Sequence, residues 1–315
     1  MRLRLSKVLV LGVLASALLA TAGSAATTQF ATGMLTPETI TQTASGAFLV
    51  TDATATNDSG KIFSVPAGGG AASLLATTTS TLRGGMILPS SFGTVGGRFL
   101  AVGFDNVSGN ATASTMDSSN TVTLYHSQTG GAWTQPVLAP SFGSLSGDVL
   151  VTNQGGSVDY FTPSGGVGTL ATFSVSAFPS VSPFGGALAN PSFGEAGGPS
   201  LFVSDGGGGG IYTVDPQGNI KLFTAVPLDG GSTGLRQIAF APKEWKKYGG
   251  DLFVSQQRGT IDVVNRDGVV VGKITGAFNP RGLTFTTMSG QPTLLFSNTR
   301  NGTILKAGPG DIVPS

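Results

Sequence analysis

The stretch SLFVSDGGGGGIYTVDPQGNIKLFTA (200–225) contains three short runs of strand-forming residues separated by turns. Val, Ile, Phe and Tyr dominate the runs, whereas Gly, Asp and Asn fill the turns, where they tolerate a positive φ angle. The same arrangement returns 51 residues later in DLFVSQQRGTIDVVNRDGVVVGKITG (251–276). Strands that recur at this period indicate a repeat architecture such as a β-propeller.

Six apolar runs that end in a small polar residue mark the repeat along the chain. They are AFLVTD (47–52), RFLAVG (98–103), DVLVTN (148–153), SLFVSD (200–205), DLFVSQ (251–256) and TLLFSN (293–298). The runs predicted to follow them are GKIFSV (60–65), NTVTLY (120–125), GSVDYF (156–161), GIYTVD (210–215), GTIDVV (259–264) and GTILKA (302–307). Further runs precede and follow these pairs. Each unit is therefore predicted to form four short antiparallel strands, the composition of one propeller blade.

Prolines set the phase of the repeat. Pro89, Pro140, Pro191 and Pro242 are separated by 51 residues in every interval. An aromatic residue follows each proline; these are Phe92, Phe142, Phe193 and Trp245. Because the aromatics repeat with the blades, we expect them to pack between blades rather than to form a platform for sugars.

The two ends of the repeat array predict how the ring closes. The last unit stops after GTILKA and has no fourth strand of its own, whereas TTQFATGML (27–35) looks like the fourth strand KLFTAVPL (221–228). We expect residues 27–35 to complete the last blade, because an open blade would leave its sheet face and edge unpacked. The sequence thus predicts an all-β, six-bladed β-propeller of four-stranded antiparallel blades, in a single domain over residues 26–315.

The first residues have the features of a secretory signal peptide. Arg2, Arg4 and Lys7 precede an apolar stretch over 8–20, and small residues follow at 23–26. Residues 1–25 are therefore predicted to be removed on export to the periplasm or the medium; an uncleaved anchor is the alternative. The apolar stretch is shorter than the roughly 20 residues that a spanning helix needs, so we expect no membrane span after signal removal.

Composition narrows the classes of function. Loss of Arg2, Arg4 and Lys7 would lower the 17 basic residues to 14, against 16 acidic ones, which argues against a nucleic-acid partner. The chain has no cysteine and a single histidine, His126, which disfavours zinc sites built from several such ligands. Gly230–Gly234 matches a G-x-S-x-G motif, but no histidine follows it, so a Ser-His-Asp triad is not expected.

Several stretches resemble the NHL and SMP-30/gluconolactonase-like superfamily of six-bladed propellers. They are LFVSDGGGGGIYTVDPQGNI (201–220), DLFVSQQRGTIDVVNRDGVV (251–270) and GLRQIAFAP (234–242). The stretch APSFGSLSGDVLVTNQGGSVDYF (139–161) also resembles a repeat of secreted bacterial propeller proteins. These motifs specify blades. The resemblance therefore implies the fold and a range of functions, namely protein or glycan binding, or lactone and ester hydrolysis around a divalent metal.

Candidate ligand-binding residues are expected at one mouth of the central channel, where first strands begin and second strands end. Arg83 and Arg236 lie 153 residues apart, which is three repeats, and Arg281 takes the corresponding place in the last unit. The planar guanidinium suits carboxylate or phosphate, so an anionic or sugar ligand is predicted. The candidate set is Arg83, Arg236, Arg281, Asp52, Asp205 and Asn298. The alternative is that these arginines pair with neighbouring carboxylates and only tie blades together.

The gluconolactonase-like resemblance implies a divalent ion held by Glu, Asn and Asp at the channel mouth. Glu38, Asn153 and Asp205 offer oxygen ligands of the kind that calcium prefers. Two features oppose this prediction: Glu38 does not lie in the acidic context usual for the family, and three arginines at the same mouth would repel a cation.

The leading hypothesis from the sequence is a monomeric, exported, non-enzymatic propeller that binds a small molecule, a glycan or a protein of the cell envelope. No catalytic residue is assigned, and calcium is the one cofactor considered. The alternative is a calcium-dependent lactonase or esterase that uses Glu38, Asn153 and Asp205. A third hypothesis is a purely structural or assembly component.

Overall fold

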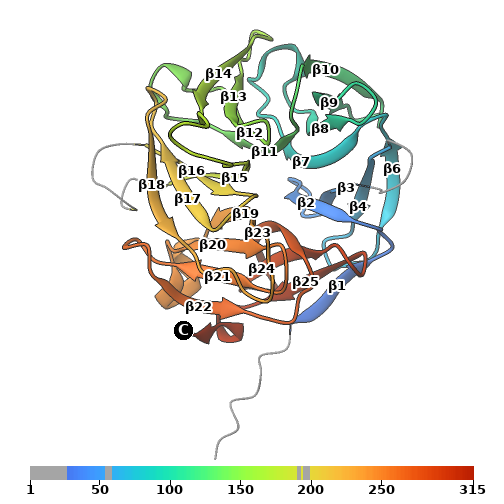
Figure 1. Cartoon of the computed structure of the whole chain (residues 1–315). Coiled ribbons are helices and arrows are strands. Elements are labelled where there is room, and N and C mark those ends of the chain that lie inside the picture. The colour runs from blue at the N-terminus through green and yellow to red at the C-terminus, as the bar shows by residue number, and fades with distance from the viewer. Residues whose placement is uncertain (1–26, 54–58, 190–192, 194–198) are drawn as a thin grey trace, which may run out of the picture.

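The computed structural model describes residues 27–53, 59–189, 193 and 199–315, whose strands form six sheets arranged in a ring (Figure 1). The first strand of each sheet lies nearest the axis and the fourth lies at the periphery (Figure 1). The predicted all-β, six-bladed propeller with four antiparallel strands per blade is confirmed. The predicted signal peptide (1–25) and Pro191 lie outside the described residues.

The blades follow one another along the chain. Blade 1 consists of β2 (Pro37–Gln42), β3 (Phe48–Asp52), β4 (Lys61–Val65) and β6 (Ser73–Thr77). Blade 2 consists of β7 (Thr81–Ile87), β8 (Phe99–Asp105), β9 (Asn110–Met116) and β10 (Val122–Gln128). Blade 3 consists of β11 (Trp133–Leu138), β12 (Val149–Asn153), β13 (Ser157–Phe161) and β14 (Val167–Thr172).

The remaining blades include both ends of the described chain. Blade 4 consists of β15 (Pro183–Leu188), β16 (Leu201–Asp205), β17 (Gly210–Val214) and β18 (Ile220–Ala225). Blade 5 consists of β19 (Leu235–Phe240), β20 (Leu252–Gln256), β21 (Ile261–Val264) and β22 (Val270–Ile274), to which β26 (Val313–Pro314) adds a short edge. Blade 6 consists of β23 (Pro280–Met288), β24 (Gln291–Asn298), β25 (Thr303–Ala307) and β1 (Thr28–Thr32), with β5 (Gly70–Ala71) beside β1.

The ring closes as the sequence predicts. Strand β1 pairs antiparallel with β25, with Thr28 opposite Lys306, and supplies the fourth strand of blade 6. At the other end of the chain, β26 pairs with β22 and places Val313 opposite Lys273. The N-terminal strand β1 is thus held by a blade that the C-terminal part of the chain builds, whereas β26 adds to the preceding blade of its own end.

The predicted order of strands in blade 2 is wrong. The run 120–125 was expected directly after the apolar run of that unit, but it falls largely in the outer strand β10, and β9 lies between them. Strand β9 has the sequence NATASTM, whose small side chains give little hydrophobic signal. Ala111 and Ala113 are nevertheless fully buried, in the core cluster that also contains Trp133 and Phe161. Their partners across the blade interface, rather than their own size, decide that β9 is a core strand.

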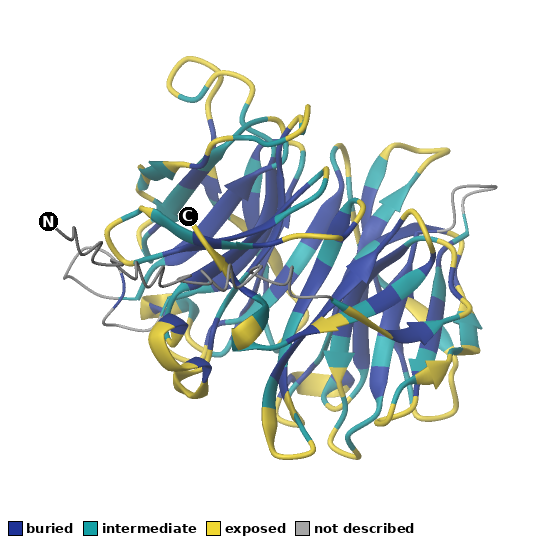
Figure 2. Cartoon of the chain, turned by 90° about the horizontal axis from the view of Figure 1, so that it is seen from below, coloured by how far each residue is buried: buried dark blue, intermediate teal, exposed yellow. Residues whose placement is uncertain are grey.

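The core lies within and between the blades, and exposed residues concentrate in the loops and outer strands (Figure 2). The aromatics that follow the phase prolines are buried, as predicted; these are Phe92, Phe142, Phe193 and Trp245. Trp245 makes edge contacts with Phe253 of blade 5 and Phe285 of blade 6, at 5.2 and 5.0 Å between ring centroids. It therefore packs between two blades. Short 3₁₀ turns form next to Phe92, Phe142 and Trp245; they are η1 (Gly93–Val95), η2 (Gly143–Leu145) and η3 (Lys243–Tyr248).

The first strands of neighbouring blades pack closely against each other. A Cβ atom on Gly84 would lie 1.6 Å from the carbonyl oxygen of Thr134 in the next blade. A Cβ on Gly282, whose φ is +39°, would lie 2.6 Å from the carbonyl oxygen of Glu38. Glycine at these places allows the backbones of neighbouring blades to approach each other, as no other residue would.

Candidate functional site

All six first strands change register at the same height, close to one mouth of the channel. The irregularities lie between Pro37 and Thr39, Leu82 and Gly84, Trp133 and Pro136, Pro183 and Gly186, Leu235 and Ile238, and Arg281 and Leu283. Bulges of this kind bend a strand and redirect its side chains, and they are common beside functional sites. Here the irregular positions carry Glu38, Arg83 and Arg236, so the bulges determine where these charges lie.

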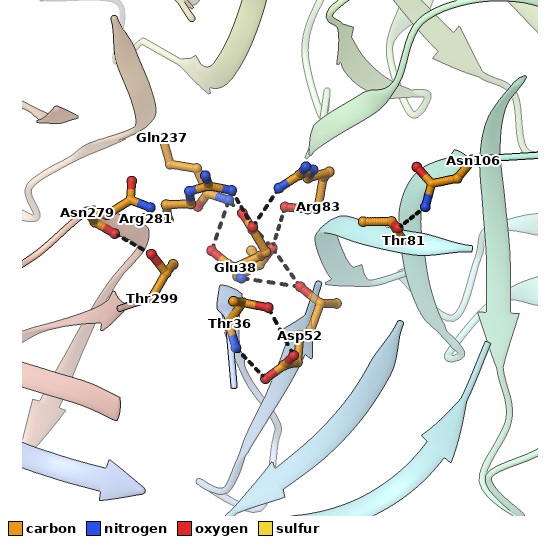
Figure 3. A network of polar contacts seen from close by, with 12 residues as sticks. Thr36, Glu38, Asp52, Thr81, Arg83, Asn106, Gln237, Asn279, Arg281 and Thr299 are labelled. Carbon is orange, nitrogen blue, oxygen red and sulfur yellow. Dashed lines mark hydrogen bonds and ion pairs between the residues drawn. The ribbon is translucent and has the colours of Figure 1, made fainter. Parts of the chain in front are cut away.

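Glu38 lies between two arginines from its neighbouring blades (Figure 3). Its Oε1 accepts a hydrogen bond from Arg83 Nη1 at 2.8 Å and another from Arg281 Nη1. The Glu38 side chain is buried, whereas those of Arg83 and Arg281 are partly exposed. One carboxylate of blade 1 therefore ties blades 2 and 6 together, which is what the assembly alternative predicts for these residues.

Arg236 of blade 5 joins this group without an ion pair of its own among the described residues. Its Nη1 donates to the carbonyl oxygen of Gly206 at 2.9 Å, and its guanidinium lies 4.8 Å from the ring centroid of Phe184. Burial, together with the positive charges of Arg281 and Arg83, lowers the pKa of Arg236 to about 10. Glu38 and Asp205 partly offset this effect. We call Glu38, Arg83, Arg236 and Arg281 the arginine cluster.

The arginine cluster has a net positive charge. Three guanidiniums face the two carboxylates, Glu38 and Asp205, whose charge acts on Arg236. The Nε atoms of Arg83, Arg236 and Arg281 are buried and find no hydrogen-bond partner within the described part of the chain. A guanidinium with donors that the protein leaves unpaired is suited to an anion, because charge-assisted hydrogen bonds to carboxylate or phosphate are strong.

Two glutamines close the channel beneath the cluster. Gln237 is fully buried, and its Nε2 donates to the carbonyl oxygen of Glu38 at 3.3 Å, from blade 5 to blade 1. Gln135 of blade 3 accepts from the amide of Gly186 at 3.0 Å and donates to the carbonyl oxygen of Ile238 at 3.1 Å. Because these amides connect blades that are not adjacent, the cluster lies at the bottom of a mouth rather than in an open pore.

The sequence reasoning missed these glutamines, although a signal was present. Gln135 and Gln237 lie 102 residues apart, which is two repeats of 51, and each stands five residues before a phase proline. Thr39 was missed as well; its hydroxyl donates to the carbonyl oxygen of Arg83 at 3.1 Å and joins blade 1 to blade 2. Glutamine and threonine carry no charge that would mark them as candidate site residues. Only the spacing of Gln135 and Gln237, two repeats, could have predicted the glutamines.

Asp52 and Asp205 hold loops at the mouth. Asp52 accepts the amides of Leu35 and Thr36 at 2.7 and 3.0 Å, in the loop that enters blade 1. Asp205 accepts the amide of Ser182 at 3.0 Å, in the loop that enters blade 4. The structure thus brings both predicted residues to the same mouth as the arginine cluster, where they position the loops around it.

Asn298 ends β24 at the same mouth, opposite Pro280 of β23. It is buried, and its Oδ1 has no hydrogen-bond partner among the described residues. Asn298 lies on β24, the neighbour of the strand β23 that carries Arg281. In this pair of strands Arg281 lies opposite Ser297. Asn298 is therefore near the cluster, but no contact joins it to a guanidinium in the part of the chain that the structure describes.

The residues predicted to hold calcium do not fit such an ion as they are arranged. Glu38 Oε1 is shared by two guanidiniums. Asn153 Oδ1 accepts the amide of Gly155 at 2.9 Å, and Asn153 Nδ2 donates to Asp159. Asp205 Oδ1 is taken by loop amides. Over the described residues, no group of three or more His, Cys, Asp or Glu side chains could hold a metal. Calcium binding stays a prediction.

Comparison with solved structures places the fold among known propellers. A gluconolactonase from Xanthomonas campestris superposes with a TM-score of 0.61 at 13% identity, over 90% of this chain and 87% of that one. A calcium-binding regucalcin from Agrobacterium tumefaciens gives 0.59 at 14% identity, over 89% and 94%. A virginiamycin B lyase from Staphylococcus aureus gives 0.57 at 14% identity, over 89% and 97%.

The chain has the fold of the gluconolactonase-like propellers. This confirms, for the architecture, the resemblance that the blade motifs indicate. No protein-family model and no curated protein matches the sequence. At such low identity the likeness extends to the fold alone, and the function has to be argued from the residues at the mouth.

Proposed function

We propose that this chain is an exported binding protein that holds a small anion at the mouth of its propeller. The observation that carries the proposal is the arginine cluster, in which three guanidiniums from blades 2, 5 and 6 lie around one buried carboxylate. Guanidiniums bind carboxylate or phosphate through parallel hydrogen bonds. Because Gln135 and Gln237 close the channel beneath the cluster, the ligand would bind at the solvent side of the mouth.

The assembly alternative explains Glu38 more fully than Arg236, which joins blade 5 to blade 4 only through uncharged groups. An arginine that only ties blades together would be expected to face a carboxylate, whereas Arg236 bonds a carbonyl oxygen at 2.9 Å and lies over Phe184. Burying a charge in this way costs free energy, as the lowered pKa of Arg236 indicates. An anion bound at the mouth would offset that cost.

Anion binding can be tested with citrate and inorganic phosphate as probes. We expect isothermal titration to detect binding to the wild-type protein, weakened at least tenfold by Arg236→Gln, with the melting temperature changed by only a few degrees. Arg266→Gln is the matched control, because that side chain is 75% exposed and lies in the hairpin at the far end of blade 5.

Two results would decide against the proposal. One is the absence of any heat with either probe on the wild-type protein. The other is a large fall in melting temperature for Arg236→Gln with unchanged probe affinity, which would assign the arginines to assembly alone.

Export is tested separately: mass spectrometry of the protein from a periplasmic fraction or the medium should find a chain that begins after residue 25. Among the described residues, no helix has the length and apolarity that a membrane crossing requires.

A second candidate function is calcium-dependent lactone or ester hydrolysis. It is supported by the fold likeness to proteins described as a gluconolactonase and a calcium-binding regucalcin. The contacts of Glu38, Asn153 and Asp205 oppose it, since two guanidiniums at Glu38 Oε1 would repel a metal ion, and amides already donate to the side-chain oxygens of Asn153 and Asp205. Titration of the purified protein with calcium chloride, elemental analysis and a lactone screen test it. Heat from calcium together with turnover of a lactone would favour this function over anion binding.

A further inference from the structure

A cleft of about 810 Å³ opens on the mouth face, between the loops that enter blades 5, 6 and 1. Its walls include Leu35, Thr36, Arg258, Phe278, Asn279 and Arg300. Leu35 and Phe278 are 58% and 53% exposed, so two large apolar side chains face solvent on the same side as the arginine cluster. Apolar surface gathered in a cleft is typical of ligand sites, and this volume suits a small organic molecule.

Two segments of the cleft wall lead along the chain to the arginine cluster, although none of the four cluster residues lines the cleft itself. Thr36 lines the cleft and stands two residues before Glu38; its hydroxyl donates to Asp52 Oδ1 at 3.2 Å. Asn279 lines the cleft and stands two residues before Arg281 (Figure 3). The hydroxyl of Thr299 donates to the carbonyl oxygen of Asn279 at 3.1 Å and fixes this corner. The segment 278–281 thus carries the apolar Phe278 and the cationic Arg281, whereas the segment 35–38 carries the apolar Leu35 and the carboxylate Glu38.

The polar groups of the cleft complement a negative charge and a hydrogen-bond donor. Arg258 and Arg300 add positive charge to the walls, and the Arg300 guanidinium lies 5.0 Å from the ring centroid of Phe278. This cation–π contact helps to hold the ring of Phe278 in place, while about half of the residue, 53%, stays exposed. Asn279 Oδ1 is buried and finds no partner within the described ranges. It is an acceptor that a ligand hydroxyl or amide could satisfy.

We propose that the mouth binds an amphipathic organic anion, a carboxylate that carries an aliphatic or aromatic body. Its carboxylate lies at Arg236 and Arg281, and its body lies on Phe278 and Leu35. The proposal rests on the anion-binding function above and goes beyond it by assigning the apolar cleft to the same ligand. A purely hydrophilic anion would leave the exposed ring of Phe278 without a role, whereas a neutral apolar ligand would leave the guanidiniums unmatched.

Calorimetry with butanoate, hexanoate and octanoate tests the proposal, with citrate and octan-1-ol as reference probes. We expect the dissociation constant to fall about two- to fourfold for each added methylene, because each one buries apolar surface in the cleft. Octan-1-ol should bind at least tenfold more weakly than octanoate. Phe278→Ser should abolish the dependence on chain length.

Leu222→Ser is the matched control, since Leu222 is similarly exposed, at 58% against 53% for Phe278, but lies on the outer strand β18. This proposal would be overturned by equal affinities for butanoate and octanoate, or by equal effects of the Phe278 and Leu222 variants. If citrate still bound in that case, the anion-binding function proposed above would stand. Octan-1-ol binding as tightly as octanoate would overturn the role of charge. Failure of both citrate and octanoate to bind would refute both proposals together.

Discussion

At the scale of single residues, Glu38 stabilises the folded arginine cluster but weakens its attraction for an anion. It neutralises part of the charge of Arg83 and Arg281, and it thereby competes with any anion for the same donors. We expect Glu38→Gln to bind citrate several-fold more tightly than wild type. The same variant should lose about 3 kcal/mol of unfolding free energy, because two partly buried guanidiniums lose the carboxylate that they share. Titration calorimetry and urea denaturation measure the two effects. Weaker citrate binding in a folded variant would show that Glu38 supports the ligand instead.

Asp262 of blade 5 makes stability depend on pH. It is fully buried, accepts from Gln256 Nε2 at 2.6 Å and lies 3.7 Å from Lys273 Nζ. Burial raises its pKa to about 6, although Gln256 and Lys273 act in the opposite direction. Since the folded carboxyl holds its proton more tightly than the unfolded one, its contribution to stability is present near pH 4 and is lost as pH rises through 6. The loss is at most about 3 kcal/mol.

The variant Asp262→Asn isolates this contribution. Urea denaturation at pH 4, 5, 6 and 7 should show that the variant gains on the wild type as pH rises, by up to about 3 kcal/mol. Asp267→Asn is the control, because Asp267 lies exposed in the hairpin after β21. Parallel curves for wild type and Asp262→Asn over this range would mean that the carboxyl is ionised throughout.

At the scale of elements, the contact between first strands depends on glycine. Gly84 in β7 faces the backbone of β11, where an added Cβ would lie 1.6 Å from the oxygen of Thr134. We expect Gly84→Ala to cost at least about 3 kcal/mol, because backbone has to move on both sides of the contact. Gly68→Ala is matched to it, since nothing lies within 4 Å of a Cβ there. Thermal unfolding of the two variants compares them. Equal melting temperatures would show that the inner ring adapts freely.

At the scale of the whole molecule, β1 is the strand that closes the ring. It completes blade 6 from the opposite end of the chain, and Phe30 and Ala31 are buried in the cluster that also holds Phe48 and Leu295. A chain whose residues 1–32 are removed should unfold at least about 10 °C lower, since blade 6 loses its edge strand and its contact with blade 1.

Removal of residues 313–315 is the matched control for that deletion. Strand β26 pairs with β22 through only two residue pairs, and Val313 and Pro314 are exposed. We expect this shorter deletion to lower the melting temperature by no more than a few degrees. If calorimetric scans gave the same loss for both deletions, closure by β1 would contribute no more than an ordinary edge strand.

The sequence by itself determined the architecture, because blades repeat and repetition is visible in one chain. The spacing of Pro89, Pro140 and Pro242 and the likeness of residues 27–35 to a fourth strand predicted blade number, phase and closure. The sequence did not predict strand β9, because alanine and threonine indicate burial only when the residues that pack against them are known. The arginines were found by the same period, because they occupy repeat positions.

Only the tertiary structure decided what those arginines face. Glu38 and Arg281 are 243 residues apart and meet because the ring brings blade 6 back to blade 1. The glutamines that close the channel and the cleft beside Phe278 likewise arise from loops and strands of different blades. Charge pairing, burial and cavity shape depend on distances across the ring, and a local pattern holds no information on these distances until the ring has closed.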